Sequence, residues 1–176
     1  MRAVPITVTA LAAAFLLTAC GGGDDSSSGG EESKAASGSA CAAGDLAMEL
    51  GAVNAAPAAG DTGNVTVTVT NNGAECTLDG FPEVEFDADG TSTAVPRNEA
   101  AEAQQLTLPE QGTTSFTITY VRAEEGGSES LAVTTVKYGL PGGEADQSFA
   151  WSYGDVALKG EDTPDASVSA FQQAGD

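Results

Sequence analysis

The sequence contains no histidine and only three cysteines among its 176 residues. Without histidine, the side chain that most readily exchanges a proton near neutral pH is missing. Ser-His-Asp and Cys-His catalytic arrangements and histidine-based metal sites are therefore excluded. Basic residues are also scarce, because 6 Lys and Arg stand against 26 Asp and Glu. A chain with a net charge of −20 lacks the clustered basic side chains that bind nucleic-acid phosphates, and anionic lipid headgroups repel it.

The sequence also lacks an apolar run that is long enough to span a bilayer. The longest run, from Ile6 to Leu17, has about 12 residues, whereas a spanning helix needs about 20. That length, preceded by Arg2, is typical of the hydrophobic part of a signal peptide. The run ends in Leu17-Thr18-Ala19-Cys20, which resembles a lipobox, the site where bacterial prolipoproteins are cut and lipidated. The alternative is a buried core helix with a chance cysteine.

The lipobox predicts how the chain is divided. Residues 1–19 are a cleaved signal peptide, and Cys20 becomes the lipid-bearing, palmitate-carrying N-terminus on the extracytoplasmic face of the cell membrane. Residues 20–40 form a disordered tether, because they contain no Val, Ile, Leu or aromatic residue to offset the entropy cost of ordering. Residues 41–172 have the size of one domain, and 173–176 are a polar tail. Removal of Arg2 leaves a mature charge of −21.

Two cysteines remain once Cys20 is assigned to the lipid. Cys41 and Cys76 form an even pair in an exported chain, where disulfides persist, so we predict that they are bonded to each other. Two thiols without close spacing and without histidine do not predict a metal site.

Alternating apolar residues predict an all-β domain. The clearest strand is Asn64 to Thr70, in which Val and Thr alternate and every residue after Asn64 is β-branched. Thr113 to Val121 places Phe116, Ile118 and Tyr120 on one face. Asp89-Gly90 lies between two alternating runs and predicts a hairpin. About nine short strands separated by turn residues, with no convincing helix, predict an antiparallel β-sandwich.

Two stretches leave alternatives open. Between Leu131 and Tyr138 the parity of the apolar residues changes, which predicts either a bulge near Thr134-Thr135 or a strand covered on both faces. Gln147 to Tyr153 carries the richest aromatic strip of the chain. Trp151 in this strip is expected in the core, and a surface platform for carbohydrate or peptide is the alternative.

Carboxylates supply the remaining candidates for chemistry. Glu83 and Glu85 share the outer face of one predicted strand, about 6.5 Å apart, which superficially suits a glycosidase pair. A glycosidase, however, needs one acid with a raised pKa in a cleft, and these two side chains are expected to be solvated. Asp87 to Gly90 resembles the start of a calcium loop, but the twelfth position is Asn98 instead of glutamate. Asp87 and Asp89 are therefore weak metal candidates, and a hairpin turn is the simpler interpretation.

Several motifs together resemble a known family. A lipobox and polar linker lead to Cys41, a strand closes on Thr70-Asn71-Asn72-Gly73, and Cys-Thr-Leu-Asp-Gly-Phe-Pro follows at residues 76–82. Leu-Pro-Glu-Gln-Gly at 108–112 and an aromatic strand that ends at Trp151 lie downstream. Over roughly Cys41 to Phe171 this resembles an actinobacterial lipoprotein family, the domain of unknown function 4232. The resemblance implies an immunoglobulin-like sandwich with the Cys41–Cys76 disulfide, and it implies no activity and no catalytic residue.

These observations lead to three functional hypotheses. The first is a non-catalytic, lipid-anchored module of the cell envelope that binds a partner or acts structurally, with Glu83, Glu85 and Trp151 as the candidate binding surface. The second is a lipoprotein that captures cations or solutes through acidic residues that include Asp87 and Asp89. A carboxylate-dependent hydrolase is the least favoured. We expect no cofactor and no nucleic-acid partner; the expected partners are the membrane, reached through the lipid, and an envelope protein or a cation.

Overall fold

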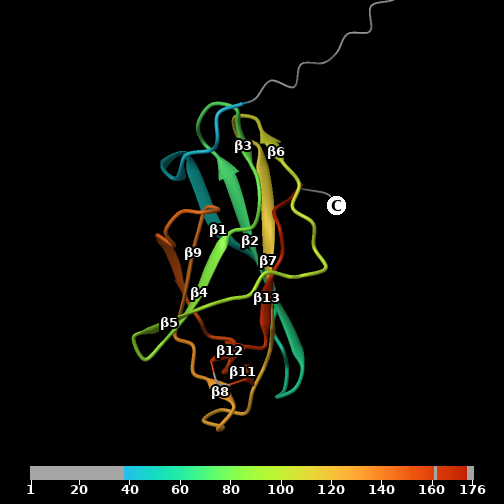
Figure 1. Cartoon of the computed structure of the whole chain (residues 1–176), viewed down its shortest axis with the longest axis vertical. Coiled ribbons are helices and arrows are strands. Elements are labelled where there is room, and N and C mark those ends of the chain that lie inside the picture. Colours follow the sequence, from blue (N-terminus) through green and yellow to red (C-terminus); the bar gives the residue numbers. More distant parts are fainter. Residues whose placement is uncertain (1–37, 161, 174–176) are drawn as a thin grey trace, which may run out of the picture. The chain divides into compact units, whose positions relative to one another are not determined.

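The computed structural model describes residues 38–160 and 162–173, which fold into an antiparallel β-sandwich (Figure 1). The predicted signal peptide, Cys20 and all but the end of the predicted tether lie outside the described residues. The first sheet has the strand order β1 (Leu46–Asn54), β2 (Thr62–Asn71), β7 (Thr113–Val121) and β13 (Ala166–Val168), and β14 (Gln172–Gln173) also pairs with β7. The second sheet has the order β10 (Gln147–Ala150), β9 (Thr135–Gly139), β4 (Glu83–Ala88) and β5 (Thr91–Ala94).

Two smaller sheets lie at the two ends of the sandwich (Figure 1). At one end β3 (Cys76–Leu78) pairs with β6 (Leu106–Leu108), and the short 3-10 turn η1 (Ala43–Asp45) precedes β1. At the other end β11 (Val156–Gly160) pairs with β12 (Thr163–Pro164) and with β8 (Ser130–Leu131). No helix among the described residues has the length and apolar character needed to cross a membrane.

The order of the strands is that of an immunoglobulin domain. In chain order β1, β2 and β7 correspond to strands A, B and E of one sheet, and β10, β9, β4 and β5 correspond to G, F, C and C′ of the other. The edge beyond β7, which strand D occupies in immunoglobulin domains, is filled here by β13 from the C-terminal part of the chain. The predicted all-β, immunoglobulin-like sandwich is therefore confirmed.

The core is built by the predicted alternation. In β2 and β7 every second residue is buried, and the six large apolar side chains among them are completely so: Val65, Val67, Val69, Phe116, Ile118 and Tyr120. In the facing sheet Val84 and Phe86 on β4 and Val136 on β9 are also buried. β-Branched residues with a period of two favour strands that bury one face, so this part of the fold follows directly from the sequence.

The region from Leu131 to Tyr138 corrects a prediction. The change of parity arises because the segment contains two strands, β8 and β9, that belong to different sheets. Between them the Val133 amide donates to the Leu131 carbonyl at 2.9 Å and the Thr134 amide donates to the Asp87 carbonyl at 2.9 Å. The chain turns out of one sheet and enters another, so neither a single bulged strand nor a strand covered on both faces is present.

Gly63 on β2 is required by the packing of a buried tyrosine. It lies opposite Tyr120 in the ladder, and the Tyr120 hydroxyl accepts from the Ala56 amide at 3.2 Å and donates to the Tyr153 carbonyl at 3.3 Å. A Cβ at position 63 would overlap the Tyr120 ring and lie 2.7 Å from the Ala56 nitrogen.

We therefore expect Gly63→Ala to lower the free energy of unfolding by about 1–3 kcal/mol, because overpacking displaces the ring and its hydrogen bonds. Urea denaturation measures this effect. Gly160→Ala is the matched control, since a Cβ there meets open space and should change stability by less than about 0.5 kcal/mol. Equal stabilities of the two variants would contradict the prediction.

Candidate binding surface

The outer face of the β10-β9-β4-β5 sheet gathers five carboxylates. The alternation of β4 buries Val84 and Phe86 and turns three acids outward, while the loop between β9 and β10 adds two more. We call these residues the acidic face: Glu83, Glu85, Asp87, Glu144 and Asp146. Four of them, all except Asp87, line an open depression of about 550 Å³ whose floor includes Lys137. The structure therefore brings together three acids at alternate positions of β4 and two acids from the loop that follows β9.

Two basic side chains hold part of the acidic face in place. Lys137 lies opposite Glu85 in the β4–β9 ladder, and its Nζ is 2.8 Å from Asp87 Oδ2 and 3.1 Å from Ser92 Oγ. At the other end of β4, Arg97 Nη2 is 3.0 Å from Glu83 Oε1. Within the described part of the chain no ion pair reaches Glu85, Glu144 or Asp146, so these three carboxylates are the ones available to a ligand.

Two groups on this face, Asp87 and Lys137, shift each other's pKa. The hydrogen bond from Lys137 holds the pKa of Asp87 below its usual range, and Asp87 in turn raises the pKa of Lys137, with a smaller contribution from Glu85. A glycosidase acid needs the opposite shift, a raised carboxyl pKa that retains its proton near neutrality. The lowered pKa of Asp87 is therefore the opposite of the shift that a glycosidase acid needs.

The lowered pKa of Asp87 makes a pH-dependent prediction. A carboxyl whose folded pKa is depressed stabilises the fold above its unfolded pKa of about 3.9, and this contribution is lost as the pH falls through the folded value. We expect Lys137→Met to move the Asp87 pKa upward, because it removes the hydrogen bond that lowers it. Carbon-detected NMR titration of the carboxyls measures this shift, with Asp45, which precedes β1 of the other sheet, as an internal control. An unchanged Asp87 pKa would contradict the assignment.

Asp87 and Asp89 belong to the β4–β5 hairpin, Asp87 on strand β4 and Asp89 in the turn. Asp89 (φ 51°) and Gly90 (φ 81°) both adopt left-handed conformations between β4 and β5, as a two-residue primed turn requires. The Asp87 carboxylate is engaged by Lys137 and Ser92. Among residues 38–160 and 162–173 no three potential His, Cys, Asp or Glu ligands lie together as a metal site. The hairpin interpretation of Asp87 to Gly90 is therefore confirmed.

Trp151 belongs to the core, as expected from the aromatic strip, and its inclusion in the candidate binding surface is corrected. Its side chain is 7% exposed, and its indole N–H donates to the Gly154 carbonyl at 2.7 Å. Its ring packs against Phe86, Tyr120 and Tyr153 at centroid distances of 5.4, 4.8 and 4.8 Å. A tryptophan with a satisfied indole N–H inside an aromatic cluster is not a platform for carbohydrate or peptide.

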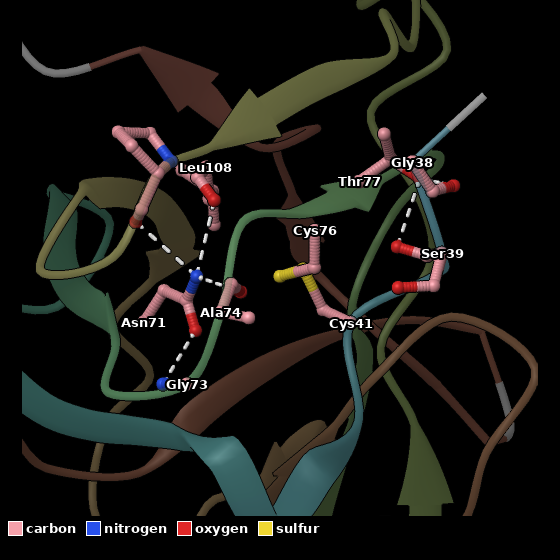
Figure 2. The surroundings of a disulfide bond; sticks show 10 residues. Gly38, Ser39, Cys41, Asn71, Gly73, Ala74, Cys76, Thr77 and Leu108 are labelled. Carbon is pink, nitrogen blue, oxygen red and sulfur yellow. Dashed lines mark hydrogen bonds between the residues drawn. A yellow bond between two sulfur atoms is a disulfide. The ribbon is translucent and has the colours of Figure 1, made fainter. Parts of the chain in front are cut away.

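The predicted disulfide is confirmed at the β3 end of the sandwich (Figure 2). Cys41 and Cys76 are joined, with their Cα atoms 4.9 Å apart. The chain before Cys41 runs parallel to β3: the Thr77 amide donates to the Ser39 carbonyl at 2.9 Å, and the Cys41 amide donates to the Thr77 carbonyl at 3.0 Å. The end of the predicted tether therefore pairs with β3 beside the disulfide.

Asn71 is an organising residue that the sequence interpretation took only as part of a turn. It is completely buried, and its side-chain amide donates to the carbonyls of Ala74, Leu108 and Pro109 at 2.8, 3.0 and 3.2 Å (Figure 2). Its Oδ1 accepts from the Gly73 amide at 2.9 Å. One side chain thus ties the β2–β3 turn to the segment between β6 and β7. Asn-Asn-Gly signals a turn, but nothing local in the sequence shows that the first asparagine is buried.

The comparison with protein families assigns the chain. A family model described as "Domain of unknown function (DUF4232)" matches residues 41–172. A search of the curated proteins found no match. The matched region begins at the first disulfide cysteine and ends in β14, so it covers nearly all of the sandwich described above. The chain therefore belongs to the DUF4232 family.

Proposed function

We propose that this protein is a lipid-anchored lipoprotein of the cell envelope and that its immunoglobulin-like domain is a non-catalytic binding module for a cationic partner. The observation that carries the proposal is the acidic face, an open depression in which Glu85, Glu144 and Asp146 remain without ion pairs among the described residues. Glu85 lies on β4 of the packed sheet, whereas Glu144 and Asp146 lie on the loop between β9 and β10, and all three line the open depression where a partner can reach them. The lipobox at Cys20 supplies the anchor.

Charge complementarity favours a basic protein surface as the partner. Acidic side chains around an open depression attract cationic groups over several ångströms and steer their encounter. The depression is wide and open and includes no buried unpaired acid, features that suit a protein surface better than a small enclosed substrate.

Chemical crosslinking in living cells tests this proposal. We compare the wild type with Glu85→Gln/Glu144→Gln and with the control Glu124→Gln/Glu75→Gln, which makes the same charge change at exposed positions elsewhere. We expect the yield of the main crosslinked partner to fall about tenfold in the first variant, equivalent to about 1.4 kcal/mol, and to stay near the wild-type value in the control. Equal yields in the two variants would show that the acidic face is not the binding surface.

The anchor has a separate test. Cys20→Ala removes the thiol that the lipidation step needs, so we expect the protein to leave the membrane fraction and to appear in the soluble fraction or the medium. Fractionation followed by immunoblotting measures this change. Gly160→Ala is the control, because it leaves the lipobox intact and is expected to fold like the wild type. Membrane retention of Cys20→Ala would refute the proposed lipidation site.

Loose capture of a divalent cation is the second candidate. It rests on the four carboxylates that line one open depression, Glu83, Glu85, Glu144 and Asp146, although no three of them lie close enough together among the described residues to form a metal site. Calorimetric titration with Ca²⁺ and a thermal-shift measurement test it. Binding heat that disappears in Glu85→Gln/Glu144→Gln and persists in Glu124→Gln/Glu75→Gln would support capture. No heat and no thermal shift with the wild type would remove this candidate.

A further inference from the structure

The edge strand β1 is unusually exposed for a strand of its length. It pairs only with β2, and the six residues from Glu49 to Asn54 are all exposed. Leu50 is 43% exposed and Val53 is 39% exposed, and these are the only large apolar side chains among the described residues that are so open to solvent. Their partners in the ladder, Val67 and Val65, are completely buried, so Leu50 and Val53 lie on the inner side of the sheet, where the opposite sheet does not cover them.

The free edge of β1 also presents unused backbone groups. In an antiparallel ladder, residues alternate between those bonded to the partner strand and those whose N–H and C=O point away. The Asn72 amide donates to the Asp45 carbonyl at 2.8 Å, so residues 45 and 72 are a hydrogen-bonded pair of the β1–β2 ladder. Because the positions alternate, Met48 and Leu50 are not hydrogen-bonded to β2. Their amides and carbonyls therefore face the open edge, and the Leu50 side chain lies beside them.

This edge carries few of the features that usually prevent strand addition. Natural edge strands are blocked by lysine, proline, inward-pointing charges or bulges, or they are kept very short. β1 has nine residues, contains neither proline nor lysine, and carries one charged side chain, Glu49. Its bulge lies between Leu50 and Val53, so the segment from Leu46 to Leu50 keeps a regular register of five successive pairs with β2.

We propose that the β1 edge, defined by Met48, Leu50 and Val53, receives an extended basic segment of a partner protein as an added strand. Backbone hydrogen bonds to Met48 and Leu50 supply the pairing, and alternate apolar side chains of the segment cover Leu50 and Val53. The partner is basic because the chain carries a net charge of −20 and Glu49 lies on this strand. The same charge disfavours a second copy of this chain, because two acidic molecules repel each other. This edge belongs to the sheet opposite the acidic face, and the inference does not depend on that face.

Peptide titration by NMR tests the proposal. The protein is the full mature chain with Cys20→Ser, and the probe is the synthetic peptide KVTVKVTK. We expect shifts of the Met48 and Leu50 amides and at least tenfold slower hydrogen exchange there, with no change at the free edges of β5 and β10. The peptide N-methylated at alternate residues lacks the donors that a strand needs and should not bind. The acidic peptide EVTVEVTE should bind at least tenfold more weakly.

Variants separate the edge from general electrostatics. Leu50→Asp should weaken binding of KVTVKVTK about tenfold, and Val53→Asp should do the same if Leu50→Asp proves poorly folded. Thr91→Asp, on the exposed edge strand of the other sheet, adds the same charge and should leave the affinity unchanged or slightly improved. Absence of binding, binding that tolerates the N-methyl groups, or equal effects of Leu50→Asp and Thr91→Asp would overturn the proposal. Self-association through β1, seen by sedimentation and abolished by Leu50→Asp, would overturn it in favour of a second copy.

Discussion

Replacing Cys41 and Cys76 by serine is expected to lower the free energy of unfolding by about 4 kcal/mol. The disulfide spans a sequence separation of 35 residues, and cross-linking a loop of that length removes about this much conformational free energy from the unfolded chain. Marginal stability of natural domains means that such a loss is a large fraction of the total. We therefore expect a markedly lower urea midpoint and, at elevated temperature, a substantial unfolded population.

The tertiary structure gives this disulfide a second role. It fixes the start of the domain to β3 and holds the hydrogen bonds that Thr77 makes with Ser39 and Cys41. Hydrogen exchange should therefore report loss of protection at the backbone amides of residues 41 and 77 in the double-serine variant. The double-serine variant and the reference protein both carry Cys20→Ser, so that neither has a thiol outside the bridge. A loss of less than about 1 kcal/mol would show that the reduced chain already holds these segments together.

Asn71→Asp is expected to destabilise the protein by about 3 kcal/mol or more at neutral pH. The substitution is nearly isosteric, but it replaces an amide that donates to three carbonyls with a carboxylate that has no donor. Carbonyl oxygens left unpaired in a buried site cost about 1–3 kcal/mol, and a buried charge facing them costs more. The contacts that tie the β2–β3 turn to Leu108 and Pro109 would be lost together.

The pH dependence of this variant distinguishes the buried charge from simple loss of hydrogen bonds. Burial raises the pKa of the introduced carboxyl above its unfolded value of about 3.9, so the folded variant binds a proton more tightly than the unfolded chain. The destabilisation should therefore be smallest below pH 4 and should grow as the pH rises. Asn72→Asp, at the exposed neighbouring residue, is the matched control and should change stability by less than about 0.5 kcal/mol. Similar losses in both variants would contradict the role assigned to Asn71.

Strong local patterns account for the parts of the fold that could be predicted. β2 and β7 are long runs in which β-branched or aromatic residues alternate with polar ones, and a period of two leaves only one way to bury the apolar face. β11 and β12 were not predicted, because their residues do not alternate clearly and their pairing depends on segments far away in the chain. The same limit applies to β8 and β9, which look like one strand until their partners are known.

The candidate site was only partly accessible to sequence reasoning. Glu83 and Glu85 were predicted to share an outer face because they alternate with Val84 and Phe86 along one strand, and Asp87 continues the same alternation. Glu144 and Asp146 joined them only through the return of the chain from β9 to β10, and Lys137 only through the β4–β9 register. The sequence interpretation grouped Trp151 with this surface, but its ring faces the core, where its indole N–H finds the Gly154 carbonyl.

The sequence by itself determined the composition limits, the lipobox prediction, the cysteine pairing and the all-β class, because each depends on residue counts or on neighbours along the chain. The absence of histidine and the excess of carboxylates need no structure to exclude whole classes of chemistry. Only the tertiary structure decided that Asn71 is buried among carbonyls, that Leu50 and Val53 are left uncovered on a free edge, and which carboxylates remain available. These properties depend on which distant segments become neighbours, and burial and pairing are set by those neighbours and not by local sequence.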